Sequence, residues 1–243
     1  AAILLDYLLR NRTWPTDAYV LSTLVTTPLL RVLCQAHGVE AVDDLLVGFK
    51  HIAGEIESRG PEGFVFGCEE SIGYQAGTYC RDKDAAGAAL LTADIALELH
   101  HDGQTLWHRL DQIHSSYGSV DEFQHSVYAP GPSGRQQINE AMQTLRHNPP
   151  AEVGQHRWRG VRDYHAHEIR SLPENITGSP LPNPSSDLLI FEAVAEDAVE
   201  VTLAVRPSGT EPKIKFYGFA RQTTPGTGDT RAAILQLRDG LNT

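Results

Sequence analysis

The sequence predicts an α/β domain followed by an α+β domain whose sheet is mostly antiparallel. Two patterns lead to this fold class. Between residues 19 and 101, β-rich stretches alternate with helical stretches three times, which is typical of a sheet covered by helices. After Asp102-Gly103 this alternation stops, and residues 188–220 instead carry two β-rich runs around one loop. We therefore expect two domains, 1–112 and 113–243.

The first domain is expected to contain three strand-to-helix units. The strands fall at residues 19–25, 39–43 and 64–66, and the helices at 28–37, 49–58 and 85–101. Thr27 is the expected N-cap of the first helix and Gly38 its stop, and Asp84 is the expected N-cap of the third helix after a polar loop. The expected apolar positions of the third helix are Leu90, Leu91, Ile95, Leu97 and Leu99.

Beyond residue 102 the expected elements are shorter and more varied. They are a helix at 105–117, an extended segment at 121–128, a helix at 135–147, short β segments within 148–163 and a long loop at 173–187. The two β-rich runs that follow alternate apolar side chains at Val199, Val201, Leu203 and Val205, and at Ile214 and Phe216. The last helix is expected to run from an N-cap at Asp229 to a C-cap at Gly240.

Composition limits the classes of partner. The chain has 243 residues with 20 Lys and Arg against 31 Asp and Glu, a net charge of −11, which argues against nucleic acid or an anionic membrane as a partner. Any anion must therefore be held by a local basic pocket. Cys34, Cys68 and Cys80 are odd in number and far apart, so they indicate neither a disulfide framework nor a zinc site. We expect a cytoplasmic protein.

The loop between the two β-rich runs, residues 206–213, has the donors that a phosphate needs. Arg206 offers a two-pronged donor, Ser208 and Thr210 offer hydroxyls, and Gly209 allows close approach to the backbone. The alternative is an ordinary turn in which Arg206 makes a surface salt bridge. Composition alone leaves both interpretations open.

Two polar segments follow the third predicted strand. Glu69 and Ser71 lie just beyond its carboxyl end, where open α/β sheets present ligands, and a carboxylate beside a hydroxyl suits a polyol. Arg81 and Lys83 lie just before the helix capped by Asp84, where charge and helix dipole could hold an anion. For both segments, solvated charged side chains are the simpler alternative. The eleven histidines show no spacing typical of a metal site.

Five segments taken in order resemble the α-D-phosphohexomutase superfamily, and in particular the C-terminal half of phosphoglucomutase/phosphomannomutase. The segments are Thr26–Leu30, Gly48–Ile52, Phe66–Tyr74, Arg81–Asp84 and Arg206–Lys213. The resemblance implies that residues 1–112 are a third domain, a three-layer unit with a mixed sheet that carries the sugar-recognition loop. It implies that residues 113–243 are a fourth domain with the phosphate loop.

The resemblance also implies roles for individual residues. Glu69, Ser71 and Gly48 match positions that bind the sugar. The positions that match phosphate-binding residues are Arg206, Ser208, Gly209, Thr210, Lys213, Lys83 and Arg81. The partners so implied are a phosphorylated hexose and the N-terminal domains of the same parent chain.

In that family a phosphoserine and a bisphosphate intermediate interconvert sugar 1-phosphates and sugar 6-phosphates. Mg²⁺ and an activator of the glucose 1,6-bisphosphate type assist. The sequence contains neither the nucleophile segment nor the Asp-rich metal loop of the family. We therefore expect residues 1–243 to lack catalytic and metal-binding residues and to be inactive alone. A phosphopentomutase, a phosphoglucosamine mutase or a freestanding phosphosugar-binding module are the alternatives.

Overall fold

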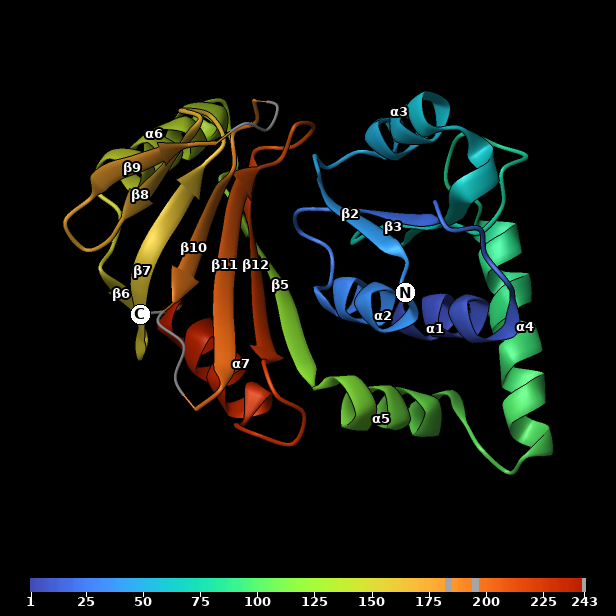
Figure 1. The fold of residues 1–243 in the computed structure, drawn as a ribbon. Helices are drawn as coiled ribbons and strands as arrows, with labels where there is room; N and C mark the ends of the chain where they lie inside the picture. The colour runs from blue at the N-terminus through green and yellow to red at the C-terminus, as the bar shows by residue number, and fades with distance from the viewer. Residues whose placement is uncertain (182–184, 194–196, 242–243) are drawn as a thin grey trace. The chain divides into compact units, whose positions relative to one another are not determined.

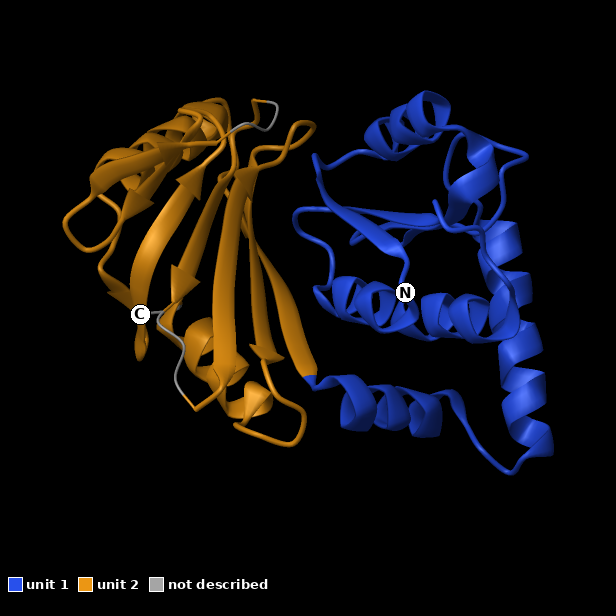
Figure 2. Ribbon diagram, in the orientation of Figure 1, with its two compact units in different colours: residues 1–119 blue, residues 120–243 orange. Residues whose placement is uncertain are grey.

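A computed structural model describes residues 1–181, 185–193 and 197–241 (Figure 1). The chain forms two compact units, Ala1–Ser119 and Val120–Thr243 (Figure 2). The boundary between the units follows helix α5 (Leu106–Tyr117), whereas the sequence predicts a boundary between residues 112 and 113, inside this helix. Helix α5 stays with the first unit because Arg109 donates from Nε and Nη2 to the buried carboxylate of Asp6, at 2.8 and 2.6 Å.

The first unit is built on a mixed four-stranded sheet in the order β2-β1-β3-β4. Its strands are β1 (Tyr19–Thr23), β2 (Glu40–Leu45), β3 (Phe64–Glu69) and β4 (Gly73–Gln75). Strand β1 is parallel to β2 and β3, whereas β4 is antiparallel to β3. The polar loop expected before Asp84 thus contains a short strand, because the chain turns back after Glu69 and pairs Gly73 with it.

Helices cover both faces of this sheet. They are α1 (Ala2–Asn11), α2 (Leu29–His37), α3 (Phe49–Arg59) and α4 (Ala85–His101), and a 3-10 turn spans Pro61–Gly63. Figure 1 shows α3 on one face of the strands and α1 and α2 on the other, which gives three layers. Tyr19, Phe64 and Ile52 belong to the core between α3 and the sheet.

Two details of these helices differ from the sequence predictions. Pro28, not Thr27, occupies the N-cap position of α2, with no side-chain cap. Leu90 and Leu97 of α4 are 65% and 58% exposed, because this helix buries only Ile95 and Leu99. The stop at Gly38 (φ 68°) is confirmed.

The second unit is an antiparallel sheet in the order β5-β12-β11-β10-β7-β8-β9, with β6 paired to β7. Its strands are β5 (Val120–Tyr128), β6 (Glu152–Val153), β7 (His156–Asp163), β8 (Glu168–Ser171), β9 (Ile176–Pro180), β10 (Leu189–Ala193), β11 (Val199–Pro207) and β12 (Lys213–Gln222). The mixed first sheet and the antiparallel second sheet confirm the predicted fold class. Strand β9 lies within the expected loop 173–187 and was missed, since its side chains are all exposed.

One face of the second sheet packs against α6 (Gly134–His147) and α7 (Thr230–Gly240). Met142 of α6 and Leu237 of α7 share one apolar core with the strands. Asp229 caps α7 as predicted, by accepting a 2.9 Å hydrogen bond from the backbone N–H of Ala232. The C-cap is Leu241, and Gly240 is the last helical residue rather than the cap.

A buried charge cluster joins α6 to the sheet. The fully buried carboxylate of Asp163 accepts from Arg146 Nε at 3.0 Å and from Arg170 Nη2 at 3.2 Å. Arg146 Nη2 also donates to Asp187 at 2.7 Å.

Within the described part of the chain, no helix is both long enough and apolar enough to cross a membrane.

Candidate ligand-binding loops

Glu69 ends strand β3 with its carboxylate largely buried. The residue is 8% exposed, and its Oε2 has no hydrogen-bond partner among the described residues. The backbone N–H of Gly48 donates to the carboxylate. Gly48 has a φ of 123°, which favours glycine, and it directly precedes α3. The structure therefore brings together two of the three residues that the sequence assigned to a sugar.

The surroundings of Glu69 have opposing effects on its charge. Burial raises the pKa of the Glu69 carboxyl above its ordinary value of 4.5 and nearby Glu70 adds to the rise, whereas Lys83 and the N–H of Gly48 lower it. A Cβ on Gly73 would lie 2.7 Å from Glu69 Cγ and 3.1 Å from Lys83 Cδ. Glycine at this position therefore leaves room for the carboxylate and the lysine stem to approach each other.

Ser71 lies at the exposed turn between β3 and β4. Its hydroxyl donates to Glu70 Oε1 at 3.3 Å, and the next residue, Ile72, has a φ of 55°. Ser71 is exposed, and within the described part of the chain Glu70 is the one side chain that its hydroxyl contacts. It is accessible to a ligand without any rearrangement of buried groups.

The two cations before α4 have different environments. Arg81 donates to Glu57 and to the backbone carbonyls of Thr78 and Cys80. Lys83 Nζ lies 2.9 Å from Asp82 Oδ1 and 5.4 Å from the ring centroid of Phe49. Lys83 is therefore the cation beside Glu69, and Arg81 is occupied by protein acceptors.

Asp84 caps α4 as predicted. Its Oδ1 accepts from the backbone N–H of Gly87 at 2.9 Å. Because the carboxylate occupies the first turn of the helix, the backbone donors there are already partly satisfied. An anion held near this helix would depend on Lys83 more than on the helix dipole.

The loop between β11 and β12 is an exposed hairpin turn. The backbone N–H of Ser208 donates to Lys213 O at 2.8 Å, and the hydroxyls of Ser208 and Thr210 lie 3.5 Å apart. Residues 209–212 are all exposed. Arg206 has no carboxylate partner among the described residues, and its Nη1 lies 3.5 Å from the hydroxyl of Tyr217. The surface salt bridge considered for Arg206 is thus not formed within the described residues.

Three cations gather on one side of this hairpin. Arg206 stands directly opposite Lys215 in the register of β11 and β12, and Lys213 is two residues from Lys215, on the same face of the sheet. Lys213 Nζ lies 2.5 Å from Glu211 Oε2, and this bond is the main cause that raises the pKa of Lys213. Like charges directly opposite each other in a sheet are unfavourable, so Arg206 and Lys215 repel each other across the two strands.

Sequence reasoning did not single out Lys215. The alternation of side chains along residues 213–217 could have placed it on the face of Lys213. Its position opposite Arg206, however, depends on the exact register of the hairpin, which is set by the length of its turn. Lys215 Nζ also lies 5.7 Å from the ring centroid of Tyr217.

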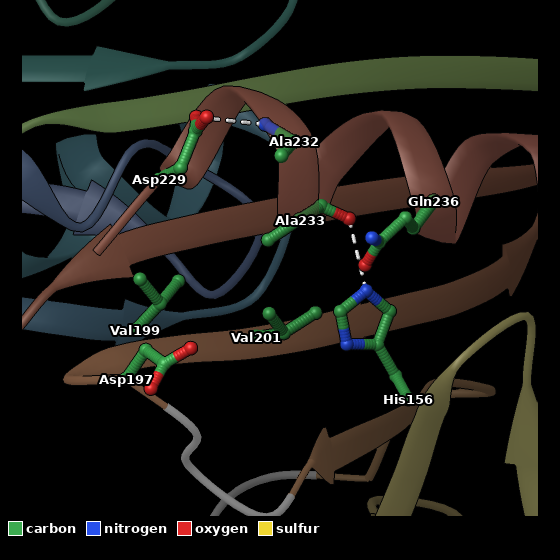
Figure 3. Close-up of a pocket in the computed structure, with 8 residues that line it drawn as sticks. All are labelled: His156, Asp197, Val199, Val201, Asp229, Ala232, Ala233 and Gln236. Carbon is green, nitrogen blue, oxygen red and sulfur yellow. Dashed lines mark hydrogen bonds between the residues drawn. The ribbon is translucent and has the colours of Figure 1, made fainter.

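A pocket of about 170 Å³ lies elsewhere in the second unit, between α7 and the start of β11 (Figure 3). Val199 and Val201 line it, and His156 Nε2 lies 2.9 Å from the backbone oxygen of Ala233. Because Val199 begins β11 and Pro207 ends it, the pocket and the basic hairpin are at opposite ends of the strand. None of the residues predicted to bind a ligand lines it.

The fold and the two loops define a class: a three-layer α/β domain with a buried carboxylate at a strand end, followed by an antiparallel α+β domain with a basic hairpin. Residues 1–117 match the family described as phosphoglucomutase/phosphomannomutase, alpha/beta/alpha domain III. The first unit of the chain is therefore similar to domain III of the phosphoglucomutase/phosphomannomutase family over nearly its whole length.

Relatives agree with this similarity along both units. A phosphoglucomutase of Staphylococcus haemolyticus is 36% identical over 219 residues, which cover 89% of this chain and 38% of the relative. A phosphoglucomutase of Staphylococcus aureus strain USA300 is 32% identical over 219 residues with the same coverage. The chain thus spans 38% of the length of these curated relatives.

Solved structures of low sequence identity share the fold. The open form of pp63/parafusin, a phosphoglucomutase from Paramecium, has a TM-score of 0.57 at 14% identity and covers all of this chain and 40% of its own. A structure described as a phosphomannomutase from Thermus thermophilus has a TM-score of 0.55 at 13% identity, over 99% of this chain and 39% of its own. At these identities the likeness concerns the fold alone.

Proposed function

We propose that this chain is the substrate-binding part of a longer phosphoglucomutase/phosphomannomutase-type isomerase, and that residues 120–243 are its fourth domain. The observation that carries the proposal is Glu69 in the unit that matches domain III. Its carboxylate is buried, accepts from Gly48, and keeps one oxygen without a partner among the described residues. A buried acceptor of this kind is costly unless a donor arrives, and sugar hydroxyls are such donors.

The sugar is held by the first unit. Glu69 accepts from one or two sugar hydroxyls, and Gly48 holds the carboxylate in place through its N–H. Ser71, exposed at the β3–β4 turn, adds a hydroxyl that can both donate and accept. Lys83 and Arg81 are the cations of this loop, and each contacts a phosphorylated ligand by sharing or releasing its present carboxylate partner, Asp82 or Glu57.

The phosphate that does not react is held by the second unit. Arg206 and Lys215 supply two positive charges that face each other across β11 and β12. Ser208 and Thr210 supply hydroxyls, and Gly209 leaves the backbone of the turn accessible. Lys213 adds a third charge, although its bond to Glu211 must loosen or be shared for it to reach a ligand. The gain from each charge-assisted bond is roughly 1.5–3 kcal/mol.

In the longer enzyme these contacts would serve phosphoryl transfer by positioning. A phosphoserine on another domain would donate its phosphoryl group to the bound sugar phosphate, and binding energy at the distant phosphate would orient the reacting hydroxyl. No described group of three or more His, Cys, Asp or Glu side chains could hold a metal ion. The proposal therefore assigns no magnesium-dependent step to these residues, and residues 1–243 alone would not turn over substrate.

Isothermal titration calorimetry of residues 1–243 with glucose 1-phosphate tests the proposal. We expect weak but measurable binding, about tenfold to a hundredfold weaker in Arg206→Ala, which loses one charge-assisted contact. Arg157→Ala is the matched control, since Arg157 is 80% exposed on β7 and pairs only loosely with Glu152 at 3.6 Å. Equal affinities in the wild-type protein and Arg206→Ala would reject the phosphate assignment.

Comparison of ligands separates the related activities. The same titration is repeated with mannose 1-phosphate, glucosamine 1-phosphate and ribose 1-phosphate. The ligand with the highest affinity indicates whether the parent is a phosphohexomutase, a phosphoglucosamine mutase or a phosphopentomutase. Assay of the longer parent protein with the preferred ligand distinguishes an isomerase from a freestanding binding module. A parent that binds the ligand but never converts it would overturn the enzymatic part of the proposal.

A further inference from the structure

The loop that carries Lys83 is organised around one buried glutamine. Gln75 is 1% exposed and lies on β4, in register with Gly67 of β3. Its Nε2 donates two hydrogen bonds of 2.8 Å, one to Gly77 O and one to Cys80 O. A single amide fixed to the sheet therefore holds two separate points of the chain between β4 and α4.

Two other contacts of this loop lie within it, and a third attaches its end to β4. Arg81 Nη1 donates to Thr78 O at 2.6 Å and to Cys80 O at 3.1 Å. The backbone N–H of Asp84 donates to Tyr74 O at 2.8 Å and fastens the far end. Loss of the Gln75 amide would leave the half-buried carbonyl of Gly77 without this donor and the carbonyl of Cys80 with Arg81 alone, so the loop would be held less firmly to the sheet.

Lys83 depends on the path of this loop for its position. Its stem passes so close to Gly73 that a Cβ there would lie 3.1 Å from Lys83 Cδ, and its ammonium lies 5.4 Å from the ring centroid of Phe49. The ion pair of Lys83 with Asp82 is exposed and cannot by itself fix the lysine relative to the sheet.

We propose that Gln75 is a positioning residue for the ligand site: by holding the carbonyls of Gly77 and Cys80, it keeps the ammonium of Lys83 beside the carboxylate of Glu69. The consequence for sugar-phosphate binding rests on the proposed function, but the positioning itself does not. Gln75 touches no ligand in this scheme and acts through Lys83.

A carboxyl titration of Glu69 followed by ¹³C NMR, without ligand, tests the positioning directly. The groups that act on Glu69 are Glu70 and Asp82, which raise its pKa, and Lys83 and the Gly48 N–H, which lower it. Lys83→Met should therefore raise the pKa of Glu69. Gln75→Met, which keeps the length of the side chain but has no donor, should raise it in the same direction.

The double variant separates positioning from an independent effect. If Gln75 acts through Lys83, the pKa of Glu69 in Gln75→Met/Lys83→Met is the same as in Lys83→Met alone. Gln35→Met, the same exchange at an exposed position of α2, should leave the titration at its wild-type value. An unchanged Glu69 titration in either single variant, or additive shifts in the double variant, would overturn the inference.

Ligand binding supplies a second, separate readout. We expect Gln75→Met to bind glucose 1-phosphate about tenfold more weakly than the wild-type chain, as is common when a supporting residue is lost. If the wild-type chain does not bind glucose 1-phosphate, the proposed function fails while the carboxyl titration still decides the role of Gln75. Should Gln75→Met fail to fold by circular dichroism, Gln75→Asn, whose amide is one methylene too short, replaces it in every comparison.

Discussion

The two candidate loops prepare for a ligand in opposite ways. Around Glu69 the protein buries one carboxylate and surrounds it with a backbone donor and a nearby lysine. Around Arg206 it leaves a turn exposed and places two cations opposite each other on neighbouring strands. The first loop is held by packing, whereas the second is an exposed turn in which like charges face each other.

This difference predicts separate responses to mutation, because each loop depends on the packing of its own unit. Substitutions of buried residues that stabilise one unit should unfold the candidate loop of that unit and leave the other loop intact. Changes at Glu69 should alter pH dependence, since a buried carboxyl titrates away from its ordinary range. Removing one of the two cations that face each other in the basic hairpin should raise the free energy of unfolding of the second unit and weaken its affinity for phosphate.

The largest effect is expected from Asp163→Asn, which breaks the support of the second unit alone. The substitution leaves Arg146 and Arg170 buried without the carboxylate that both contact. The free energy of unfolding of the second unit should therefore fall by on the order of 3–5 kcal/mol. Chemical denaturation followed by NMR should show the signals of residues 120–243 unfolding at lower denaturant. Asp239→Asn, on the exposed end of α7, is the matched control and should change little.

The contrast between the loops would fail if the signals of Glu69 and its neighbours were lost together with those of the second unit at the same denaturant concentration. Retention of a native Glu69 titration in Asp163→Asn, with the Arg206 loop unfolded, would instead show that the carboxylate loop is supported by the first unit alone.

Glu69→Gln should have a smaller effect that depends on pH. In the proposed site the ionised carboxylate is the acceptor for sugar hydroxyls, so wild-type binding should strengthen as the pH rises through the raised pKa of Glu69. The variant should bind about tenfold more weakly at neutral pH and lose this dependence. Calorimetry of both proteins with glucose 1-phosphate across this range measures it, and the titration of the ligand phosphate cancels in the comparison.

The same substitution should act on stability with the opposite sign. A carboxyl whose pKa is raised on folding stabilises the fold when protonated, and this contribution disappears as the pH rises through the folded pKa. Glu69→Gln should therefore raise the unfolding temperature of the first unit at neutral pH and leave it unchanged well below pH 4.5, the ordinary pKa of the group. A lower unfolding temperature at neutral pH would contradict the raised pKa.

Features set by local chemistry could be predicted from the sequence. Asp84 and Asp229 cap helices through bonds to residues three positions ahead, and Gly38 ends a helix through its own backbone angle. The alternating β runs likewise predicted β11 and β12, because a two-residue period is visible in any strand with one buried face.

Features set by distant partners could not be predicted in this way. Apolar residues are spread around helix α4 without one clear apolar face, so its sequence did not show that Leu90 and Leu97 are exposed. The acceptor of Arg81 is Glu57 on another helix, and the three-residue strand β4 is too short to show a period. The anchoring role of Gln75 depends on which way two carbonyls point, which no residue pattern records.

The smallest effect, and the sharpest test of the contrast, is expected from Lys215→Met. The substitution removes one of the two cations that face each other across β11 and β12. Without ligand, the free energy of unfolding of the second unit should therefore rise by about 0.2–1 kcal/mol. The same change should weaken phosphate binding, so added inorganic phosphate should raise the unfolding temperature less than in the wild-type protein. Lys213→Met is the matched control: Lys213 pairs with Glu211 and does not stand opposite Arg206, so its loss should bring no stabilisation. If Lys215→Met instead destabilised the unliganded unit, the contacts of Lys215 within the protein would outweigh its repulsion from Arg206, and the hairpin would resemble the carboxylate loop in being complete without a ligand.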